Sequence, residues 1–350
     1  PNVVASVSGG KDSTVIFHLC LQVAREKGRL PLKVMWLDQE AEWQATVDQV
    51  KLWMYHPDVE PYWYQFPFRL FNATSSTEHW LNCWDPARKE DWVHPQVDIS
   101  RKENVYGTDR FHELFAAISR VEWPAGNTCQ IAGVRCEESP ARTMGLTYYP
   151  AYKWITWGAK HSHHVTLYPI YDWSYADVWK AILNNGWPYN RIYDAQYRYG
   201  IHVQHMRVSN VHHETAVHDL FYMQELEPVT YERLVNRIHG IHMAGKMGQA
   251  DYFVGELPPM FGSWREYRDY LLEHLIDNPD WRARFLVWFN RHDRQLGEDM
   301  GKKKYTAHIN AILTNDWEGV KLNSFEHRPQ TRRVYALRKK MQEEAAVAVG

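Results

Sequence analysis

The sequence predicts an α/β fold built on a parallel sheet, followed by a mostly helical C-terminal region. Three observations carry this prediction: strand and helix patterns alternate from residue 2, the alternation resumes near residue 129, and helical spacing prevails from about residue 205. Strands separated by helices pair in parallel through right-handed crossovers. The 350 residues suffice for two domains, which we expect at 1–204 and 205–350.

The N-terminal elements follow from short apolar runs and helical periodicity. Residues 2–7 are typical of a buried strand, and a helical pattern follows the next loop. Residues 33–38 indicate a second strand, which ends in a carboxylate, and residues 62–66 indicate a third. Helical spacing over residues 43–54 lies between them. The order strand, helix, strand, helix, strand is therefore expected.

Residues 70–125 interrupt this alternation. They are rich in Trp, Pro, Asn and charged residues, which indicates an insertion with its own short helices. Its aromatic and basic side chains could form a lid or a base-stacking wall, or the tryptophans could be the small core of the insertion. The sequence leaves both interpretations open for Trp80, Trp84, Arg88, Lys89, Trp92, Arg101 and Lys102.

The later elements are expected from apolar runs and capping signals. Residues 129–134 and 165–170 indicate two more buried strands. Ser174 with Asp177 three residues later has the pattern of a capping box, so a helix should begin there. A second such pattern precedes the helical spacing of residues 263–275.

Composition excludes several classes of protein. The formal net charge of −2 gives no overall nucleic-acid footprint. No apolar run approaches the roughly 18 residues of a membrane span. None of the four cysteines forms a CxxC pair, which argues against a disulfide framework, a Cys₄ zinc site and an iron–sulfur cluster. We therefore expect a cytoplasmic protein with reduced thiols.

The segment SGGKDS, residues 8–13, lies between the first strand and the first helix. Glycines allow the backbone to approach an anion, and a helix N-terminus adds partial positive charge. Lys11 adds a full charge, whereas Asp12 suits a helix cap or a contact with Mg²⁺. The spacing GxxxxGK[ST] of the common nucleotide hydrolases is absent. The segment predicts a phosphate-binding loop of a different kind.

SGGKDS resembles the pyrophosphate loop (PP-loop) of the ATP pyrophosphatases and their relatives, which include the phosphoadenosine-phosphosulfate (PAPS) reductases. Two further segments match this superfamily in the expected order. GVRCEESPAR, residues 133–142, is similar to its Gly-x-Arg-x-x-Glu-Ser-x-x-Arg stretch. Residues 168–200 are similar to its Pro-Ile-x-x-Trp-[ST]-x-x-Asp-Val-Trp segment and the later Pro-x-Asn-x-x-Tyr. Three ordered motifs over about 200 residues are far more specific than one loop.

The resemblance implies a Rossmann-like fold of the adenine nucleotide alpha-hydrolase type, with helices on both faces and an adenine nucleotide at the carboxyl ends of the strands. It implies that the phosphates are held by Ser8, Gly9, Gly10, Lys11, Asp12 and Ser13. Asp38 would lie near the adenosine, and Gly133 would also contact the nucleotide. The candidate catalytic residues are Lys11, Asp12, Arg135 and Arg142. For Arg135, an ordinary ion pair with Glu137 or Glu138 is the alternative interpretation.

The resemblance also implies the chemistry. ATP pyrophosphatases bind ATP with Mg²⁺, cleave it to AMP and pyrophosphate, and adenylate an acceptor, here expected in nucleic-acid modification or sulfur transfer. PAPS reductases need a mobile cysteine, and no cysteine follows Cys136, so ATP is favoured over PAPS. A PAPS reductase-type enzyme remains the alternative. No residue identifies the acceptor.

A third alternative is a nucleotide-sensing regulatory subunit. The helical extension from residue 206 resembles that of phage- and prophage-encoded PAPS reductase-like proteins, some of which pair with a ParB-like partner. That resemblance implies a ParB-like protein or nucleic acid as partner, and a homo-oligomer is compatible with it. Histidines cluster at 161–164, 202–205 and 212–218. Zinc uses such spacings, but no cysteine or carboxylate completes a set, so surface or core-edge histidines are the default.

Overall fold

The chain divides into two compact units. The first comprises Pro1–Thr74 and Trp80–Lys246, and the second comprises Ser75–His79 and Met247–Gly350. The computed structural model describes residues 2–75, 77–138, 142, 150–152, 155–157, 164–203, 206–208, 210–212, 219–244, 256–296, 301–313, 316, 319 and 322. The segment 205–246, which the sequence places at the start of a second domain, thus belongs to the first unit.

A seven-stranded sheet forms the centre of the first unit, in the order β3-β2-β1-β6-β9-β8-β7. Five neighbouring strands are parallel: β3 (Val59–Tyr64), β2 (Leu32–Leu37), β1 (Asn2–Ser6), β6 (Thr128–Ile131) and β9 (His164–Leu167). At one edge, β8 (Ile155–Trp157) and β7 (Pro150–Tyr152) run antiparallel. The predicted α/β fold with a parallel sheet is confirmed. The antiparallel edge was not predicted, because strands of three residues leave no periodic pattern.

The strand order defines where a ligand would bind. From β1 the chain moves outward to β2 and β3, and it then returns to β6 on the other side of β1. In an open parallel sheet, such a reversal opens a crevice at the carboxyl ends of the two central strands. The 8–13 loop follows β1 and the Gly133 motif follows β6. Two of the three sequence motifs therefore meet at the reversal.

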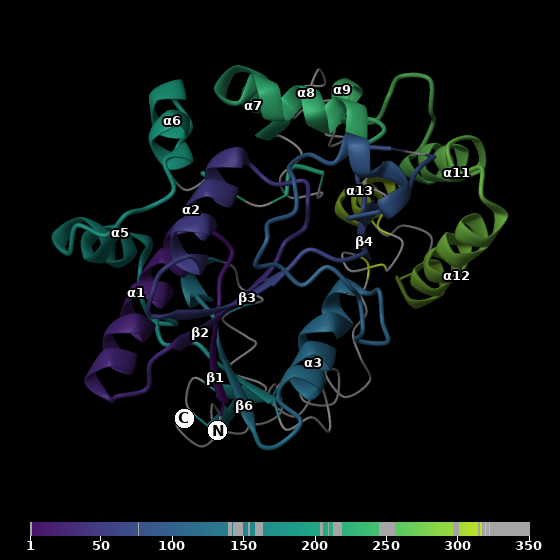
Figure 1. The fold of residues 1–350 in the computed structure, drawn as a ribbon. Helices are drawn as coiled ribbons and strands as arrows, with labels where there is room; N and C mark the ends of the chain where they lie inside the picture. The colour runs from purple at the N-terminus through teal and green to yellow at the C-terminus, as the bar shows by residue number, and fades with distance from the viewer. Residues whose placement is uncertain are drawn as a thin grey trace, which may run out of the picture. The chain divides into compact units, whose positions relative to one another are not determined.

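Helices cover both faces of this sheet (Figure 1). One face carries α1 (Lys11–Glu26), α2 (Gln44–Met54) and α5 (Tyr175–Asn184), and the other carries α3 (Phe111–Glu122). The central strand β2 is buried from both sides, and five of its six residues are apolar and not alternating with polar ones. Ser174 caps α5 in a full capping box with Asp177, as predicted. Beyond α5 lies α6 (Ile192–Tyr199).

A small hairpin interrupts the sheet pattern between β3 and α3. It pairs β4 (Phe68–Phe71) with β5 (Trp80–Cys83) and leads into a 3₁₀ helix, η1 (Pro86–Asp91). Trp84 is fully buried, and its indole Nε1 donates to the Asp38 carbonyl at 2.8 Å. This tryptophan is therefore part of the core. α3 belongs to the main fold, since it makes the crossover from β3 to β6.

The first unit also includes the helices α7 (Leu220–Leu226), α8 (Pro228–Arg237) and α9 (Ile241–Ala244). α7 and α8 lie at the end of the sheet away from the N-terminus (Figure 1). The Glu227 carboxylate accepts from the backbone N–H groups of Gln44 and Ala45, at 2.7 and 3.0 Å, and so caps α2. The buried Arg237–Glu40 ion pair, at 2.6 Å, makes a second connection.

The secondary-structure elements described in the second unit are helices, as predicted for the C-terminal region. It contains α11 (Trp264–His274), α12 (Pro279–Leu296) and α13 (Lys302–Leu313). Ser263 caps α11 by accepting from the Glu266 N–H, but the Glu266 carboxylate accepts from Gly262 and not from Ser263. The expected capping box is thus half formed. Arg268, paired with Asp293 at 2.9 Å, is buried at the centre of the unit.

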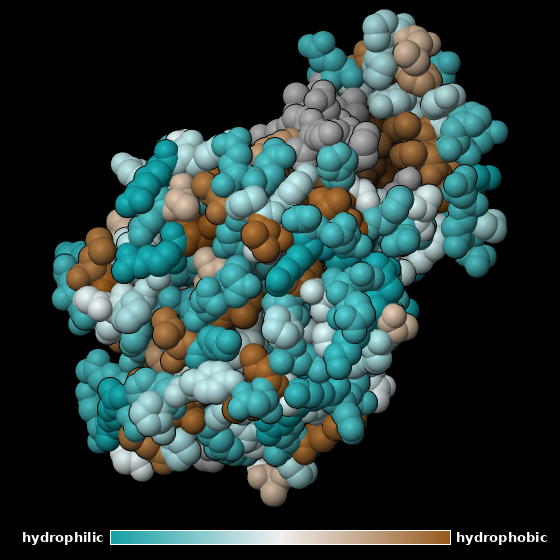
Figure 2. Space-filling view, turned by 45° about the horizontal axis from the view of Figure 1, so that its top comes forward, coloured by the Kyte–Doolittle hydropathy of each residue, from teal (hydrophilic) through white to brown (hydrophobic). Residues whose placement is uncertain are grey.

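Figure 2 shows a face on which hydrophilic residues mostly separate small groups of hydrophobic ones. Scattered apolar side chains of this kind are usual on folded proteins and do not by themselves mark an interface. Among the helices that the structure describes, none combines the length and apolarity needed to cross a bilayer.

Candidate functional site

The 8–13 loop is held in one conformation by its neighbours. Gly9 has a φ of +72°, which favours glycine, and a Cβ there would lie 2.6 Å from Cγ2 of Thr46 on α2. The Asn190 amide donates to the Gly9 carbonyl at 3.1 Å and to Oγ1 of Thr46 at 3.0 Å. The Ser8 N–H donates to the Ser13 hydroxyl at 2.9 Å, which closes the loop. The loop is therefore preorganised.

The loop leads directly into the N-terminus of α1. Gly10 is the N-cap residue, and no side chain caps the helix. The Lys11 N–H donates to the Tyr193 hydroxyl at 3.2 Å. A helix start without a side-chain cap presents N–H groups and partial positive charge to a ligand. An anion such as a phosphate group would supply the acceptors that a capping side chain normally supplies.

An ionic cluster joins this helix start to the second motif. Asp12 pairs with Lys11 through one oxygen, at 2.8 Å, and with Arg135 through the other, at 2.6 Å. Arg135 also pairs with Glu137 at 2.7 Å and donates to the Trp173 carbonyl at 3.3 Å. Burial would lower the pKa of Arg135, but the Asp12 and Glu137 carboxylates outweigh it and raise the pKa.

Arg135 makes both kinds of contact that the sequence left open, an ordinary ion pair and a contact with the 8–13 loop. It has the ordinary ion pair with Glu137, and its backbone N–H donates to the Glu138 carboxylate at 3.1 Å. It also reaches Asp12 of the loop. Arg135 is 3% exposed, so in this state it positions Asp12 and Lys11.

Gly133 allows the two motifs to approach each other. A Cβ at this position would lie 3.1 Å from both the backbone carbon and the Cβ of Asp12. A larger residue would push the first turn of α1 away from the loop that follows β6. The structure therefore brings Gly133, Arg135 and the 8–13 loop together.

Arg142 lies at the outer side of this cluster, where it pairs with Glu138. Burial lowers the pKa of Arg142, nearby Asp12 raises it, and the charges of Arg207 and Arg135 lower it further. Residues 139–141 of the predicted motif lie outside the described part of the chain. Lys11, Arg135 and Arg142 thus bring three cations to the loop, each paired with a carboxylate in this state.

Two residues of the site were present in a predicted motif without an assigned role. Asn190, which is fully buried, binds Gly9, and Tyr193, on α6, accepts from Lys11. Both belong to the Pro-x-Asn-x-x-Tyr segment. The motif was visible in the sequence. It does not show, however, that the Asn190 amide and the Tyr193 hydroxyl would support the 8–13 loop, about 180 residues away.

Two further residues were missed by the sequence analysis. Val208 lies beside the loop, since a Cβ on Gly10 would meet its Cγ2 at 3.1 Å, and the charge of the preceding Arg207 lowers the pKa of Arg142. Asp219 is fully buried, and burial raises its pKa to about 7, against the opposing effects of the Tyr222 hydrogen bond and the Arg207 charge. Neither belongs to a matched motif, so only the fold could reveal them.

Asp38 occupies the carboxyl end of β2, as expected, but its side chain faces the interior. Its carboxylate is fully buried and accepts from Trp63 Nε1 at 2.8 Å and from Gln65 Nε2 at 2.9 Å. Nε2 of His94 lies 3.2 Å from the other oxygen. Contact between Asp38 and the adenosine stays a prediction, and the visible role of the carboxylate is to hold neighbouring loops.

The residues present do not fit a dedicated magnesium site. Both oxygens of Asp12 already bind cations, and the described residues contain no group of three His, Cys, Asp or Glu able to hold a metal. Of the clustered histidines, only His164, His202 and His212 lie within the described residues, and the others fall outside them. His164 is buried, which lowers its pKa.

Three of the four cysteines are poor nucleophiles, because partial or full burial favours their neutral thiols. Burial raises the pKa of Cys20 to about 12 and also raises the pKa of Cys83 and Cys129. Cys136 is half-buried and follows Arg135 in the 3₁₀ turn η2 (Cys136–Glu138). It is therefore the cysteine that directly adjoins the ionic cluster at the loop.

Comparison with known proteins agrees with this geometry. A family model of the phosphoadenosine phosphosulfate reductase domain matches residues 2–60 and 92–199. The N-terminal part of the chain is therefore a PAPS reductase-like domain. The match to the PAPS reductase domain includes β1 and β6, the two strands between which the strand order reverses. It omits residues 61–91, which contain the β4–β5 hairpin. A second family model, a domain of unknown function designated DUF3440, matches residues 200–339.

Individual relatives have low sequence identity to this chain. The uncharacterized protein YbdN of Escherichia coli is 26% identical, over 91% of this chain and 84% of its own length. A PAPS reductase structure from Candida auris is 15% identical, covers 61% of this chain and 82% of its own, and has a TM-score of 0.34. An FMN adenylyltransferase structure from Candida glabrata is 15% identical, covers 60% and 54%, and has a TM-score of 0.36. TM-scores this low do not place individual residues.

Proposed function

We propose that this chain binds ATP with its phosphates in the 8–13 loop and transfers AMP to an acceptor. An acceptor oxygen would attack the α-phosphorus and form a new P–O bond. The bond between the α-phosphorus and the bridging oxygen would break, pyrophosphate would leave with the electron pair, and the proton of the acceptor hydroxyl would pass to water. The observation that carries this proposal is the preorganised loop and uncapped start of α1, packed against Arg135 at the sheet reversal.

The side chains suit the leaving pyrophosphate. Its charge would be met by loop N–H groups, the start of α1 and the cations that now bind Asp12. Lys11 has a flexible stem and can exchange Asp12 for a phosphate oxygen, whereas the buried Arg135 keeps Asp12 in place. Arg142 and Arg207 add charge at the mouth. Catalysis would be mainly positioning and electrostatic stabilisation, as is usual for phosphoryl chemistry.

Calorimetric titration of the full chain with ATP and Mg²⁺ tests the binding part of this proposal. Lys11→Met should weaken ATP binding about tenfold or more, because one charge-assisted contact is lost. Lys27→Met is the matched control, since Lys27 is exposed at the other end of α1. Equal affinity of both variants for ATP would place the nucleotide elsewhere.

A PAPS reductase-type activity is the second candidate, and two observations favour it. The matching family model is that of the PAPS reductase domain, and Cys136 follows Arg135 within the site. Thiol-dependent release of sulfite from PAPS, lost in Cys136→Ser, would establish this activity in place of adenylation. The regulatory role with a ParB-like partner stays a prediction, as do the acceptor class and the likeness to phage proteins.

A further inference from the structure

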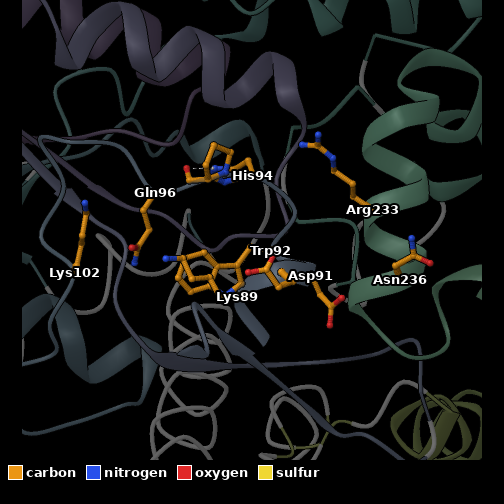
Figure 3. Close-up of a pocket in the computed structure, with 10 residues that line it drawn as sticks. Lys89, Asp91, Trp92, His94, Gln96, Lys102, Arg233 and Asn236 are labelled. Atoms are coloured by element: carbon orange, nitrogen blue, oxygen red, sulfur yellow. Dashed lines mark hydrogen bonds between the residues drawn. The ribbon is translucent and has the colours of Figure 1, made fainter. Parts of the chain in front are cut away.

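A pocket lies within the first unit, and its lining contains no residue of the 8–13 loop. It has a volume of about 520 Å³ and lies between the segment 89–102 and helix α8, and its lining includes Lys89, Trp92, His94, Lys102, Arg233 and Asn236. Figure 3 shows Arg233 and Asn236 reaching it from α8, with Trp92 and Lys89 opposite and Lys102 at the far side. A volume of this size fits a small organic molecule.

The two walls of the pocket are tied together. Arg233 donates to the Val93 carbonyl at 3.1 Å, and Arg88 donates to the Asn236 carbonyl at 3.4 Å. One turn further along α8, Arg237 forms its buried pair with Glu40. The segment 92–102 lies in the PAPS reductase match, and α8 lies in the DUF3440 match. The pocket therefore requires both parts of the chain.

The lining favours an anion. Within the described residues, Lys89, Lys102 and Arg233 have no carboxylate at ion-pair distance, whereas Asp91 is already paired with Arg88 at 2.7 Å. Glu90 is the remaining acid of the lining. Three cations thus face one remaining carboxylate, and this excess attracts negatively charged groups.

The lining also offers a flat wall. Trp92 is half-buried, and its Nε1 donates to the Asp85 carbonyl at 3.0 Å, so the ring cannot turn freely. It meets the buried Trp84 ring edge-on at a centroid distance of 5.2 Å. A fixed indole beside cations suits a ligand that has a planar ring and an anionic group.

Two contacts connect the lining of the pocket to the carboxyl ends of β2 and β3. His94, buried at the pocket wall, contacts the Asp38 carboxylate at the end of β2. Gln96, also in the lining, donates to the carbonyl of Gln65, which follows β3. β3 lies two strands from β1, so the ends of these two strands are about 10 Å apart.

We propose that this pocket binds the acceptor, a small organic anion that combines a carboxylate or phosphate with a planar ring. The assignment of the occupant as acceptor rests on the proposed function, whereas the binding of such an anion does not. Lys89, Lys102 and Arg233 hold the anionic group, and Trp92 holds the ring. The remainder of the acceptor extends toward the α-phosphate.

Affinity labelling with pyridoxal 5′-phosphate tests the proposal on the full chain, since this probe has a planar ring, a phosphate and an aldehyde that forms an imine with a lysine amine. Borohydride reduction fixes the label, and peptide mass spectrometry locates it. Lys89 and Lys102 should be labelled saturably and at lower probe concentration than the exposed Lys51 and Lys180. Uniform labelling of all four lysines overturns the proposal.

Substitutions on α8 distinguish the effect of the Arg233 charge on labelling from an effect of its structural contacts. Arg233→Glu should lower labelling of Lys89 and Lys102 about fivefold, which corresponds to about 1 kcal/mol, and Arg233→Lys should restore it. Glu232→Gln, the exposed neighbour, is the matched control and should leave labelling unchanged. Unchanged labelling in Arg233→Glu, or loss in Arg233→Lys as well, contradicts the proposal.

Addition of ATP distinguishes this pocket from the nucleotide site. ATP should protect Lys11 from the label and leave Lys89 and Lys102 reactive. If Lys11 is not protected while the pocket lysines behave as described, the proposed function fails and the pocket stands. If ATP protects Lys89 and Lys102 as well as Lys11, the pocket is part of the nucleotide site and the proposal fails.

Discussion

The shape of the 8–13 loop depends on close contact between Gly9 and helix α2, and Gly9→Ala tests this directly. The substitution has two costs. A φ of +72° is unfavourable for alanine by about 1–2 kcal/mol. The new methyl group would lie 2.6 Å from Cγ2 of Thr46 and 3.3 Å from its carbonyl oxygen, and overpacking of this kind costs about 1–3 kcal/mol. The total loss of stability is then about 2–5 kcal/mol.

Two companion variants separate these costs. Gly28 has a φ of +62°, and a Cβ added there would meet nothing within 4 Å, so Gly28→Ala measures the backbone cost alone, about 1 kcal/mol. Thr46→Ser removes the clashing methyl group and keeps the hydroxyl that accepts from Asn190. In the double variant with Gly9→Ala, it should recover about 1–3 kcal/mol of coupling energy.

Urea unfolding of each full-length variant, followed by tryptophan fluorescence, gives the required free energies. The reasoning is refuted if Gly9→Ala costs no more than Gly28→Ala. It is also refuted if Thr46→Ser leaves the Gly9→Ala penalty unchanged, because the loop would then not be shaped by its contact with α2.

Three further predictions concern charged groups. Arg135→Gln should raise the dissociation constant for ATP about tenfold or more in calorimetry, since Asp12 would lose the partner that positions it; an unchanged constant would remove Arg135 from the site. Asp219 has a pKa of about 7 in the folded chain and about 3.9 when unfolded. Between these two pH values the carboxyl group is protonated in the folded chain and ionised in the unfolded chain. The free energy of unfolding therefore falls as the pH rises from 4 through 7. Asp219→Asn should therefore gain stability over the wild type by up to about 4 kcal/mol between pH 4 and pH 8, and a constant difference in urea unfolding would contradict this. Arg237→Met should cost about 3–5 kcal/mol in the same unfolding assay, because it leaves Glu40 buried without its cation, and Glu40→Gln in the same chain should recover part of that loss; a double variant less stable than Arg237→Met would refute the explanation.

The sequence allowed the fold class and the loop to be predicted because both depend on local patterns. The strands at residues 2–7 and 33–38 and the helix after Ser174 were each placed within a residue or two. The 8–13 loop was evident from its glycines between a strand and a helix. These features need no knowledge of distant contacts.

The parts that sequence analysis missed depend on contacts between distant segments. Asn190 supports Gly9 across 181 positions, and Asp219 acquires its pKa only from burial in the folded chain. Asp38 was expected near the ligand, but the surrounding indole and amide donors that enclose it come from later strands and loops. A single sequence does not show which polar side chains will be enclosed in this way.

The pocket beside α8 was only half anticipated. The sequence left open whether the tryptophans of residues 70–125 form a wall or a core. Trp84 is in the core, and Trp92 lines the pocket. The other wall comes from α8, which lies far along the chain, so no local pattern could have completed it.

Analysis of the phosphate products tests the central claim most directly. The full chain would be incubated with Mg²⁺ and ATP labelled in its γ-phosphate, with and without a small-molecule cell extract, and the products separated. The account predicts that the label appears in pyrophosphate, matched by an equal amount of AMP bound to an acceptor from the extract, and that both products are lost in Lys11→Met but not in Lys27→Met. Release of the label as orthophosphate with ADP, or equal turnover in both variants, would contradict it.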